Sequence, residues 1–307
     1  MQVFQITLSQ ILLLFALMAV GFGFNRSGLM PKETSRVLSR LETYLFLPCL
    51  NFKTFYDSLR MDKLQVAGEL LLYGTVTMAA SFLIATLISR FFAKEGYEKG
   101  VYAYSFTISN MGFMGNALVQ GVFGAETFFQ YMMFQIPFLI FIYTYGMYVL
   151  VPRQEGKGFT LKHLANPSLV GLGLGAVFGL LEIPLPSFLT GTVSAAATCM
   201  SPVAMLIVGF VLANYSLKKL SKNVRIYISC VVRLVAIPLA VYLLMRVLQV
   251  GENVMRVAVC ISALPMGLNT IVFPEAYGGD ATTGAAMALI SHIMAIITMP
   301  VLFGLLL

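Results

Sequence analysis

The chain has 307 residues, of which 59% are hydrophobic and 11% are charged. Because soluble globular proteins carry about 25% charged residues, this composition excludes a water-soluble domain and indicates a chain that folds in lipid. The net charge of +7 does not indicate a nucleic-acid partner, because the basic residues stand in short loops between apolar runs and form no patch interleaved with aromatic residues.

A bilayer core requires about 20 apolar residues per helix, and by this measure the chain contains ten membrane helices. The expected helices cover residues 5–25, 33–57, 64–92, 99–123, 127–151, 166–182, 187–214, 223–248, 253–278 and 281–306. Residues 1–10 contain no basic segment, so we expect the first apolar run to stay in place rather than be removed as a signal peptide. The sequence therefore predicts an all-α, multi-pass membrane protein.

The basic residues predict the orientation of these helices. Fourteen Lys and Arg residues fall on one side of the expected helices and five on the other, with Arg233 inside a helix. Because cytoplasmic loops carry the excess of Lys and Arg, we expect the fourteen in the cytoplasm and both chain termini outside. The expected location is the plasma (cytoplasmic) membrane.

The longest polar connection divides the chain into two halves. Residues 1–152 and 166–307 each contain five expected helices, and residues 153–165 form the connecting loop. Because each half has an odd number of helices, the second half enters the membrane in the opposite orientation to the first. The sequence therefore predicts two inverted five-helix repeats. The halves also resemble each other, because at an offset of 155 residues the stretch 109–127 aligns with 264–283.

The fourth and ninth expected helices both contain Gly and Asn, and the ninth also Pro, in the middle. Gly costs roughly 1 kcal/mol and Pro roughly 3 kcal/mol in a helix interior, so we expect each of the two helices to be split into two half-helices. In the ninth helix the expected breaks are at Pro265 and Pro274. Two interrupted helices at corresponding positions of two halves indicate a transporter's binding site. The candidate substrate-binding residues are Asn110, Gly112, Gly115, Asn116, Pro265, Gly267, Asn269 and Thr270.

The chemistry expected at these breaks is mainly that of the backbone. The N-terminus of a half-helix presents free N–H groups and roughly half a positive charge, which suits a carboxylate, whereas unwound carbonyl groups suit a cation or a proton-linked water. The side chains of the asparagines and of Thr270 add donors and acceptors without a fixed charge. The alternative is that the small residues only permit close helix crossings.

Four ionisable residues within the expected helices are candidates for ion coupling or charge pairing, because charges in a membrane are costly. Glu42, Arg233 and His292 fall near the middle of their helices, and Glu275 falls in the cytoplasmic half of the ninth. His292 titrates in the physiological range and is a candidate for proton coupling beside Glu42 or Glu275. The alternatives are an ion pair for Arg233 and a packing role for His292.

No cofactor or metal is expected, apart from possible coupling to H⁺ or Na⁺. The four cysteines each lie in an apolar run, without a CxxC pair, and so indicate neither a disulfide framework nor a metal site.

The motifs NMGFMGNAL (110–118) and ALPMGLNTIVFPEAYGGD (263–280), with ten helices and a polar midpoint, resemble the auxin efflux carrier family. That family includes plant PIN auxin exporters and bacterial permeases for malate-like anions. The resemblance covers essentially the whole chain and favours the short, permease-like branch. The chain departs from the family pattern at Asn116, where many members have Pro, so the break in the fourth helix depends on Gly112, Gly115 and the asparagines.

The resemblance also implies a fold and a mechanism. The implied fold is that of bile-acid sodium symporters, in which helices 4 and 9 cross. Helices 1, 2, 6 and 7 form a scaffold, and helices 3–5 and 8–10 form a transport domain that moves like an elevator. A homodimer joined through the scaffold is expected.

The sequence thus predicts a secondary carrier for a small organic anion, such as a carboxylate or an auxin-like compound. An ion-coupled symporter of a bile-acid-like or other amphipathic anion is the alternative. No GxxxxGK[ST] loop for ATP is present, and the spans show no continuous polar stripe typical of a channel. We do not expect an enzyme, because Tyr277 stands where a GxGD protease motif ending at Asp280 requires Gly and no HExxH motif occurs.

Overall fold

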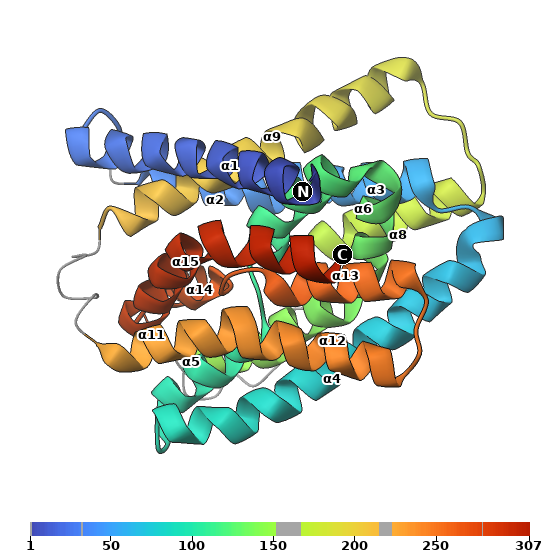
Figure 1. Ribbon diagram of the computed structural model, residues 1–307. Coiled ribbons are helices and arrows are strands. Elements are labelled where there is room, and N and C mark those ends of the chain that lie inside the picture. Colours follow the sequence, from blue (N-terminus) through green and yellow to red (C-terminus); the bar gives the residue numbers. More distant parts are fainter. Residues whose placement is uncertain (1, 32, 152–166, 215–222, 278) are drawn as a thin grey trace. The chain divides into compact units, whose positions relative to one another are not determined.

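The computed structural model describes residues 2–31, 33–151, 167–214, 223–277 and 279–307, and these ranges are helical apart from turns and one isolated bridge (Figure 1). The connecting loop expected at residues 153–165 lies outside them. The chain forms two compact units. Unit 1 comprises Met1–Leu13, Leu70–Phe159 and Tyr215–Leu307, and unit 2 comprises Leu14–Glu69 and Thr160–Asn214.

Unit 2 is built on close contact between α3 and α8. Its elements are most of α1 (Gln2–Ser27), α2 (Thr34–Leu41), η1 (Glu42–Phe46), α3 (Leu47–Ser58), η2 (Met61–Lys63), α8 (Pro167–Leu180) and α9 (Ser187–Leu212). Gly171, Gly175 and Gly179 recur every fourth residue along α8, and a Cβ at any of them would collide with a carbonyl group of α3. Small residues at this spacing let two helix backbones approach closely in a membrane. The glycine stripe therefore explains how α8 and α3 pack.

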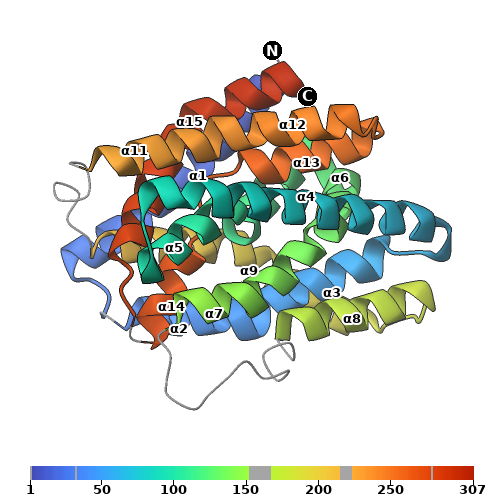
Figure 2. The ribbon, with the colours of Figure 1, turned by 90° about the horizontal axis from the view of Figure 1, so that it is seen from below.

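Unit 1 contains the two stretches that we expected to be interrupted. Its elements are α4 (Leu64–Phe92) from residue 70 onward, α5 (Gly96–Thr107), η3 (Met111–Gly115), α6 (Asn116–Phe141), η4 (Ile142–Gly146), α7 (Met147–Leu150), α11 (Val224–Val231), η6 (Val232–Ala236), α12 (Ile237–Val247), α13 (Glu252–Ala263), α14 (Asn269–Tyr277) and α15 (Thr282–Leu306), with the first residues of α1. Figure 2 shows α12 and α13 side by side, and α13 also packs against α6 and α15.

Two of the helices contain a π-helical turn directly before a proline. Pro48 and Pro238 are each the second residue of the helix that follows such a turn, which is η1 before α3 and η6 before α12. Proline has no N–H to donate to the carbonyl group four residues earlier, so the preceding turn widens. The widened turns carry Glu42 and Arg233, and π-turns are frequent at functional sites.

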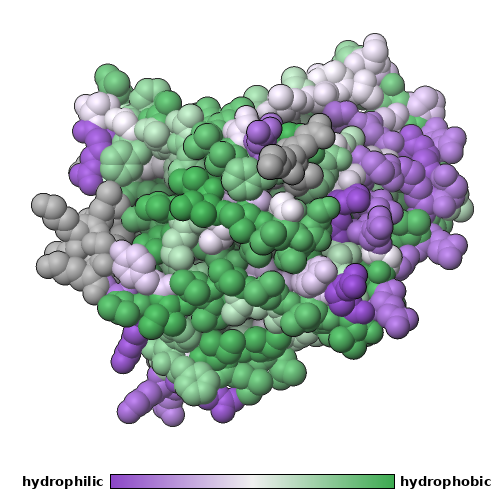
Figure 3. Space-filling view, in the orientation of Figure 1, coloured by the Kyte–Doolittle hydropathy of each residue, from purple (hydrophilic) through white to green (hydrophobic). Residues whose placement is uncertain are grey.

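Six helices within the described ranges are long and apolar enough to cross a membrane. They cover Phe4–Ser27, Met61–Phe92, Met111–Leu150, Ser187–Leu212, Val224–Val247 and Thr282–Leu306, and Pro167–Leu180 is a shorter apolar helix. Large hydrophobic side chains lie exposed on them, such as Leu243 and Val247 of α12 and Ile297 and Leu305 of α15. Figure 3 shows hydrophobic side chains predominating along α12 and α15. This surface is typical of a protein in lipid.

The helix Met111–Leu150 includes residues that we had assigned to two separate expected helices, 99–123 and 127–151. Within it, Gly124 has φ 79° and ψ −177°, which is not helical, so the chain bends sharply there. A side chain at this position would be strained, because a positive φ favours glycine. Residues 111–150 therefore form one long, bent helix where the sequence predicts parts of two.

Candidate functional site at the crossing of two interrupted helices

The two expected interruptions lie against each other in unit 1. Helix α5 ends at Thr107 before η3 begins at Met111, and α13 ends at Ala263 before α14 begins at Asn269. We call residues 108–110 and 264–268 the crossing. Its backbones pair in antiparallel fashion between Ser109 and Met266. Asn110 N donates to Pro265 O at 2.8 Å, and Gly267 N donates to Ile108 O at 3.3 Å.

The second interruption lies at Pro265 and not at Pro274. Pro274 is inside α14, so our expectation of a helix break at that residue was wrong. The helix begins earlier because Leu268 O accepts from Ile271 N at 2.8 Å and from Val272 N at 3.0 Å. The only intrahelical bond that Pro274 removes is the one to Thr270 O, which is too little to end a helix that has already formed its first turn.

Two consecutive residues of α15 support both sides of the crossing. Ser291 Oγ accepts from Met266 N at 3.1 Å, and His292 Nε2 lies 2.8 Å from Asn110 Nδ2. The side chains of Ser291 and His292 are both fully buried. The main chain of one interruption and a side chain of the other are therefore hydrogen-bonded to the same turn of α15.

The partners of His292 determine its tautomer. Nδ1 lies 2.7 Å from Ala288 O, and because a carbonyl oxygen only accepts, Nδ1 carries the hydrogen. Nε2 is then an acceptor and receives the hydrogen bond from Asn110 Nδ2. Asn110 Oδ1, which is buried, has no hydrogen-bond partner among the described residues. The pair thus holds a neutral imidazole and leaves one amide oxygen free.

Four helix ends with opposite polarity meet at the crossing. The N-termini of η3 and α14 carry partial positive charge there, and the C-termini of α5 and α13 carry partial negative charge. Gly115 N donates to Asn110 O at 2.9 Å, which closes the first turn of η3. The N–H groups of Met111 to Phe113 precede the first such bond and therefore have no acceptor within the helix.

The three candidate glycines differ in their surroundings. A Cβ at Gly112 would meet nothing within 4 Å, so there is open space beside it. A Cβ at Gly267 would lie 3.1 Å from Ser109 O, in the facing strand of the crossing. A Cβ at Gly115 would collide with the Tyr131 hydroxyl and with Leu264. Gly267 and Gly115 therefore allow close packing, and only Gly112 borders free space.

The remaining candidate side chains are held by partners that we did not predict. Asn269 Nδ2 donates to Tyr104 Oη at 3.0 Å, and Thr270 Oγ1 donates to Gly267 O at 3.0 Å. Gln135 Nε2 donates to Asn116 Oδ1 at 3.4 Å, so Asn116 is held by a residue of its own helix, α6, beyond the bend at Gly124. Tyr104 and Gln135 were missed because a single polar residue in an aromatic run gives no periodic signal.

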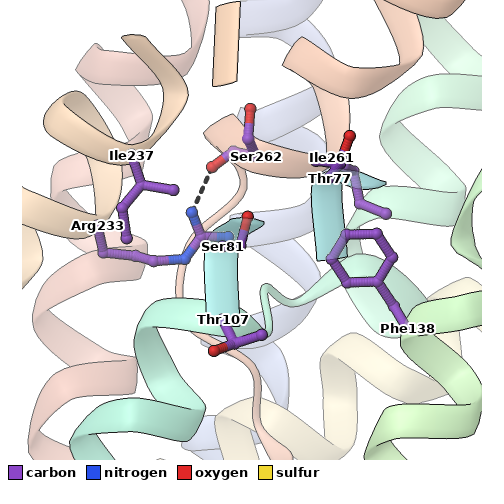
Figure 4. A pocket seen from close by; sticks show the side chains of 8 residues that line it. All are labelled: Thr77, Ser81, Thr107, Phe138, Arg233, Ile237, Ile261 and Ser262. Atoms are coloured by element: carbon purple, nitrogen blue, oxygen red, sulfur yellow. Dashed lines mark hydrogen bonds between the residues drawn. The ribbon is translucent and has the colours of Figure 1, made fainter. Parts of the chain in front are cut away.

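The four ionisable candidates are divided between the two units. Glu42 belongs to unit 2, where it is 3% exposed and neither carboxylate oxygen has a described partner. Arg233 belongs to unit 1, where it lines a small cavity and donates to Ser262 O (Figure 4). The side chain of Glu275 lies outside the described residues. His292 therefore pairs with Asn110, and the described residues give it no carboxylate neighbour.

No group of three His, Cys, Asp or Glu side chains among the described residues is placed to hold a metal ion. The crossing therefore offers backbone groups, amide side chains and one imidazole.

Comparison with known proteins places this architecture among transporters. The profile of a family described as "Membrane transport protein" matches residues 6–160 and again 157–303. The chain is 20% identical over 303 residues to the uncharacterized transporter YfdV of Escherichia coli, covering 95% of each chain. It is 22% identical over 287 residues to an uncharacterized transporter of Methanocaldococcus jannaschii, covering 90% of this chain and 91% of the other.

A yeast relative matches only in part. An uncharacterized transporter of Schizosaccharomyces pombe is 26% identical over 102 residues, and the match spans 33% of this chain and 23% of that protein. The full-length bacterial and archaeal matches are therefore the ones that describe the whole chain.

Proposed function

Because the chain belongs to the membrane transport protein family, the auxin efflux carrier family, and is a multi-pass transporter rather than an enzyme, we propose that it is a secondary carrier of a small organic anion. The substrate is a carboxylate or an auxin-like compound, and it binds at the crossing. The ten helices form two inverted five-helix repeats of the bile-acid-symporter type, with helices 4 and 9 broken where they cross.

The observation that carries this proposal is the pairing of the two interrupted helices, with Asn110 N donating to Pro265 O at 2.8 Å. In hydrocarbon, interrupted backbone persists only where protein or a water-filled cavity satisfies it. Carriers built from inverted repeats place their substrate at such discontinuous helices. The crossing therefore has the features of a binding site near the middle of the membrane.

The chemistry of the crossing favours an anion with a carboxylate group. The free N–H groups at the start of η3, with the partial positive charge of that helix end, attract negative charge. Tyr104 Oη accepts from Asn269 and keeps its own hydrogen for a further acceptor. Gly112 leaves open space through which the ligand approaches the main chain.

The division into two units supports an elevator mechanism. Unit 1 contains the whole crossing, and unit 2 contains α2, α3, α8 and α9. We propose that unit 1 is the transport domain, formed by helices 3–5 and 8–10, and that unit 2 provides the scaffold of helices 1, 2, 6 and 7. The glycine-mediated packing of α8 on α3 suits a rigid scaffold through which a homodimer forms.

The proposed environment is the plasma membrane, with both termini outside. The excess of basic residues on one side of the helices supports this orientation. Measuring uptake with and without a pH gradient, and with sodium replaced by choline, distinguishes coupling to H⁺ from coupling to Na⁺.

Uptake into proteoliposomes tests the function. We expect saturable uptake of at least one compound from a panel of labelled mono- and dicarboxylates, with acceleration by the same unlabelled compound on the opposite side. The Asn110→Ala and Asn269→Ala variants are expected to lose uptake, and Asn223→Ala, which changes an exposed helix cap, is the matched control. Normal uptake by both crossing variants would contradict the proposed site, and uptake without counterflow would indicate a channel.

A further inference from the structure

A buried arginine of unit 1 has almost none of its hydrogen-bonding capacity satisfied. Arg233 is 1% exposed, and its guanidinium donates to one described acceptor, Ser262 O. A guanidinium has five N–H donors, and Nε is buried without a partner. No described carboxylate pairs with it. Because an uncompensated charge is costly in a membrane protein, other groups in unit 1 have to balance it.

Two helix C-termini lie beside this guanidinium. Ser262 is in the last turn of α13, and Thr107, the last residue of α5, lines the same cavity as Arg233 (Figure 4). The last four carbonyl groups of a helix have no partner within the helix, and its end carries roughly half a negative charge. The ends of α5 and α13 together offset roughly one positive charge. Arg233 therefore has a counter-charge made of backbone.

The cavity beside Arg233 is small and lined by hydroxyl groups. It leaves room for about one water molecule, and it is lined by Thr77, Ser81, Thr107, Phe138, Arg233, Ile237, Ile261 and Ser262. Figure 4 shows the guanidinium of Arg233 extending toward Ser81 and Ser262. The lining is thus polar on the side of the guanidinium.

The hydroxyl groups of the lining act mainly as acceptors toward the cavity. Thr77 donates its hydrogen to Tyr73 O at 2.7 Å, and Thr107 donates to Ala103 O at 2.8 Å. Ser262 Oγ donates to Val259 O at 3.1 Å. A hydroxyl group has one hydrogen, so these three hydroxyl groups have none left to donate to an anion. Apart from Arg233 itself, such a lining suits a cation, because an anion requires donors.

We propose that Arg233 is a built-in cation of the crossing. In carriers with discontinuous helices, the C-terminal ends of half-helices coordinate the coupling cation. Here the guanidinium occupies that position permanently, so no free cation binds at the ends of α5 and α13. The inference rests on the proposed function only in treating the crossing as the part that moves substrate.

Removing the side chain tests this role without a substrate. The full chain is purified in detergent, and its unfolding temperature is measured in choline chloride, with part of the choline replaced by sodium or by about 20 mM guanidinium. Arg233→Ala is compared with Arg233→Lys, which keeps a charge, and with Arg246→Ala, which removes an exposed cation from α12. Chloride is also exchanged for gluconate at constant cation.

We expect Arg233→Ala to unfold at a lower temperature than the wild type and to regain roughly 3 °C, saturably, on addition of guanidinium. Wild type and Arg246→Ala are expected not to respond, and Arg233→Lys is expected to lie between wild type and Arg233→Ala. The proposal is overturned if guanidinium fails to stabilise Arg233→Ala, or if chloride stabilises the wild type and not Arg233→Lys. The second comparison decides even where Arg233→Ala does not fold.

Discussion

Replacing Asn110 by Ala removes a buried hydrogen bond whose strength the surroundings make predictable. Asn110 Nδ2 donates to His292 Nε2 at 2.8 Å, and both side chains are at most 2% exposed. Without Asn110, the imidazole keeps its Nδ1 bond to Ala288 O but loses the partner of Nε2. A buried acceptor without a partner costs about 1–3 kcal/mol.

The cost is measured best in a double-mutant cycle. We expect Asn110→Ala and His292→Ala each to destabilise the protein, and the double variant to lose less than the sum of the two by about 1–2 kcal/mol. For a chain of this size, this corresponds to roughly 2–4 °C in unfolding temperature. The parallel cycle of Asn116→Ala with His292→Ala serves as the control, because Asn116 bonds to Gln135 and not to His292.

The assay uses the buried cysteines, since the chain contains no Trp. Cys230 and Cys260 are fully buried in unit 1, so a thiol-reactive fluorescent dye labels them only on unfolding. Cys199 is exposed and Cys49 is partly exposed, so both are replaced by Ser in all variants. Additive losses in the Asn110 and His292 cycle, within about 0.5 kcal/mol, would refute the hydrogen bond as a source of stability.

Three further predictions concern single residues. Gly284→Val is expected to destabilise unit 1 by about 1–3 kcal/mol, because its Cβ would collide with Thr270, and Gly173→Ala, with open space around it, serves as the control in thermal unfolding. Replacing His292 by Gln is expected to change the pH profile of anion uptake, and an unchanged profile would exclude His292 from coupling. Hydrogen bonds from the side chain and the N–H of Thr282 hold the pKa of Asp280 below its usual value. The stabilisation is therefore present above about pH 4 and is lost as the pH falls through the lowered pKa. The unfolding temperatures of wild type and Asp280→Ala should differ at pH 7 and converge in acid.

Much of the architecture was accessible from the sequence because lipid restricts the possible structures. Long apolar runs have to form helices, since the bilayer offers no partner for free N–H and C=O groups. For the same reason, Gly and Asn in the middle of such a run, as at 110–116, or Pro265 in the second run, had to mark an interruption. Both interruptions lie in the stretches that this argument indicates, whereas Pro274 lies inside α14.

The tertiary structure decided which side chains meet. Hydropathy shows that Asn110, His292 and Arg233 lie within apolar runs, but it contains no information on partners more than 100 residues apart. Folding placed His292 against Asn110 and left Arg233 beside two helix ends instead of a carboxylate. Which of these side chains meet depends on how each helix is rotated about its axis, to within the length of a hydrogen bond. The packing of the helices sets that rotation. The sequence alone determined that this chain crosses a membrane with two interrupted helices, and the packing of unit 1 determined the chemistry at the place where they cross.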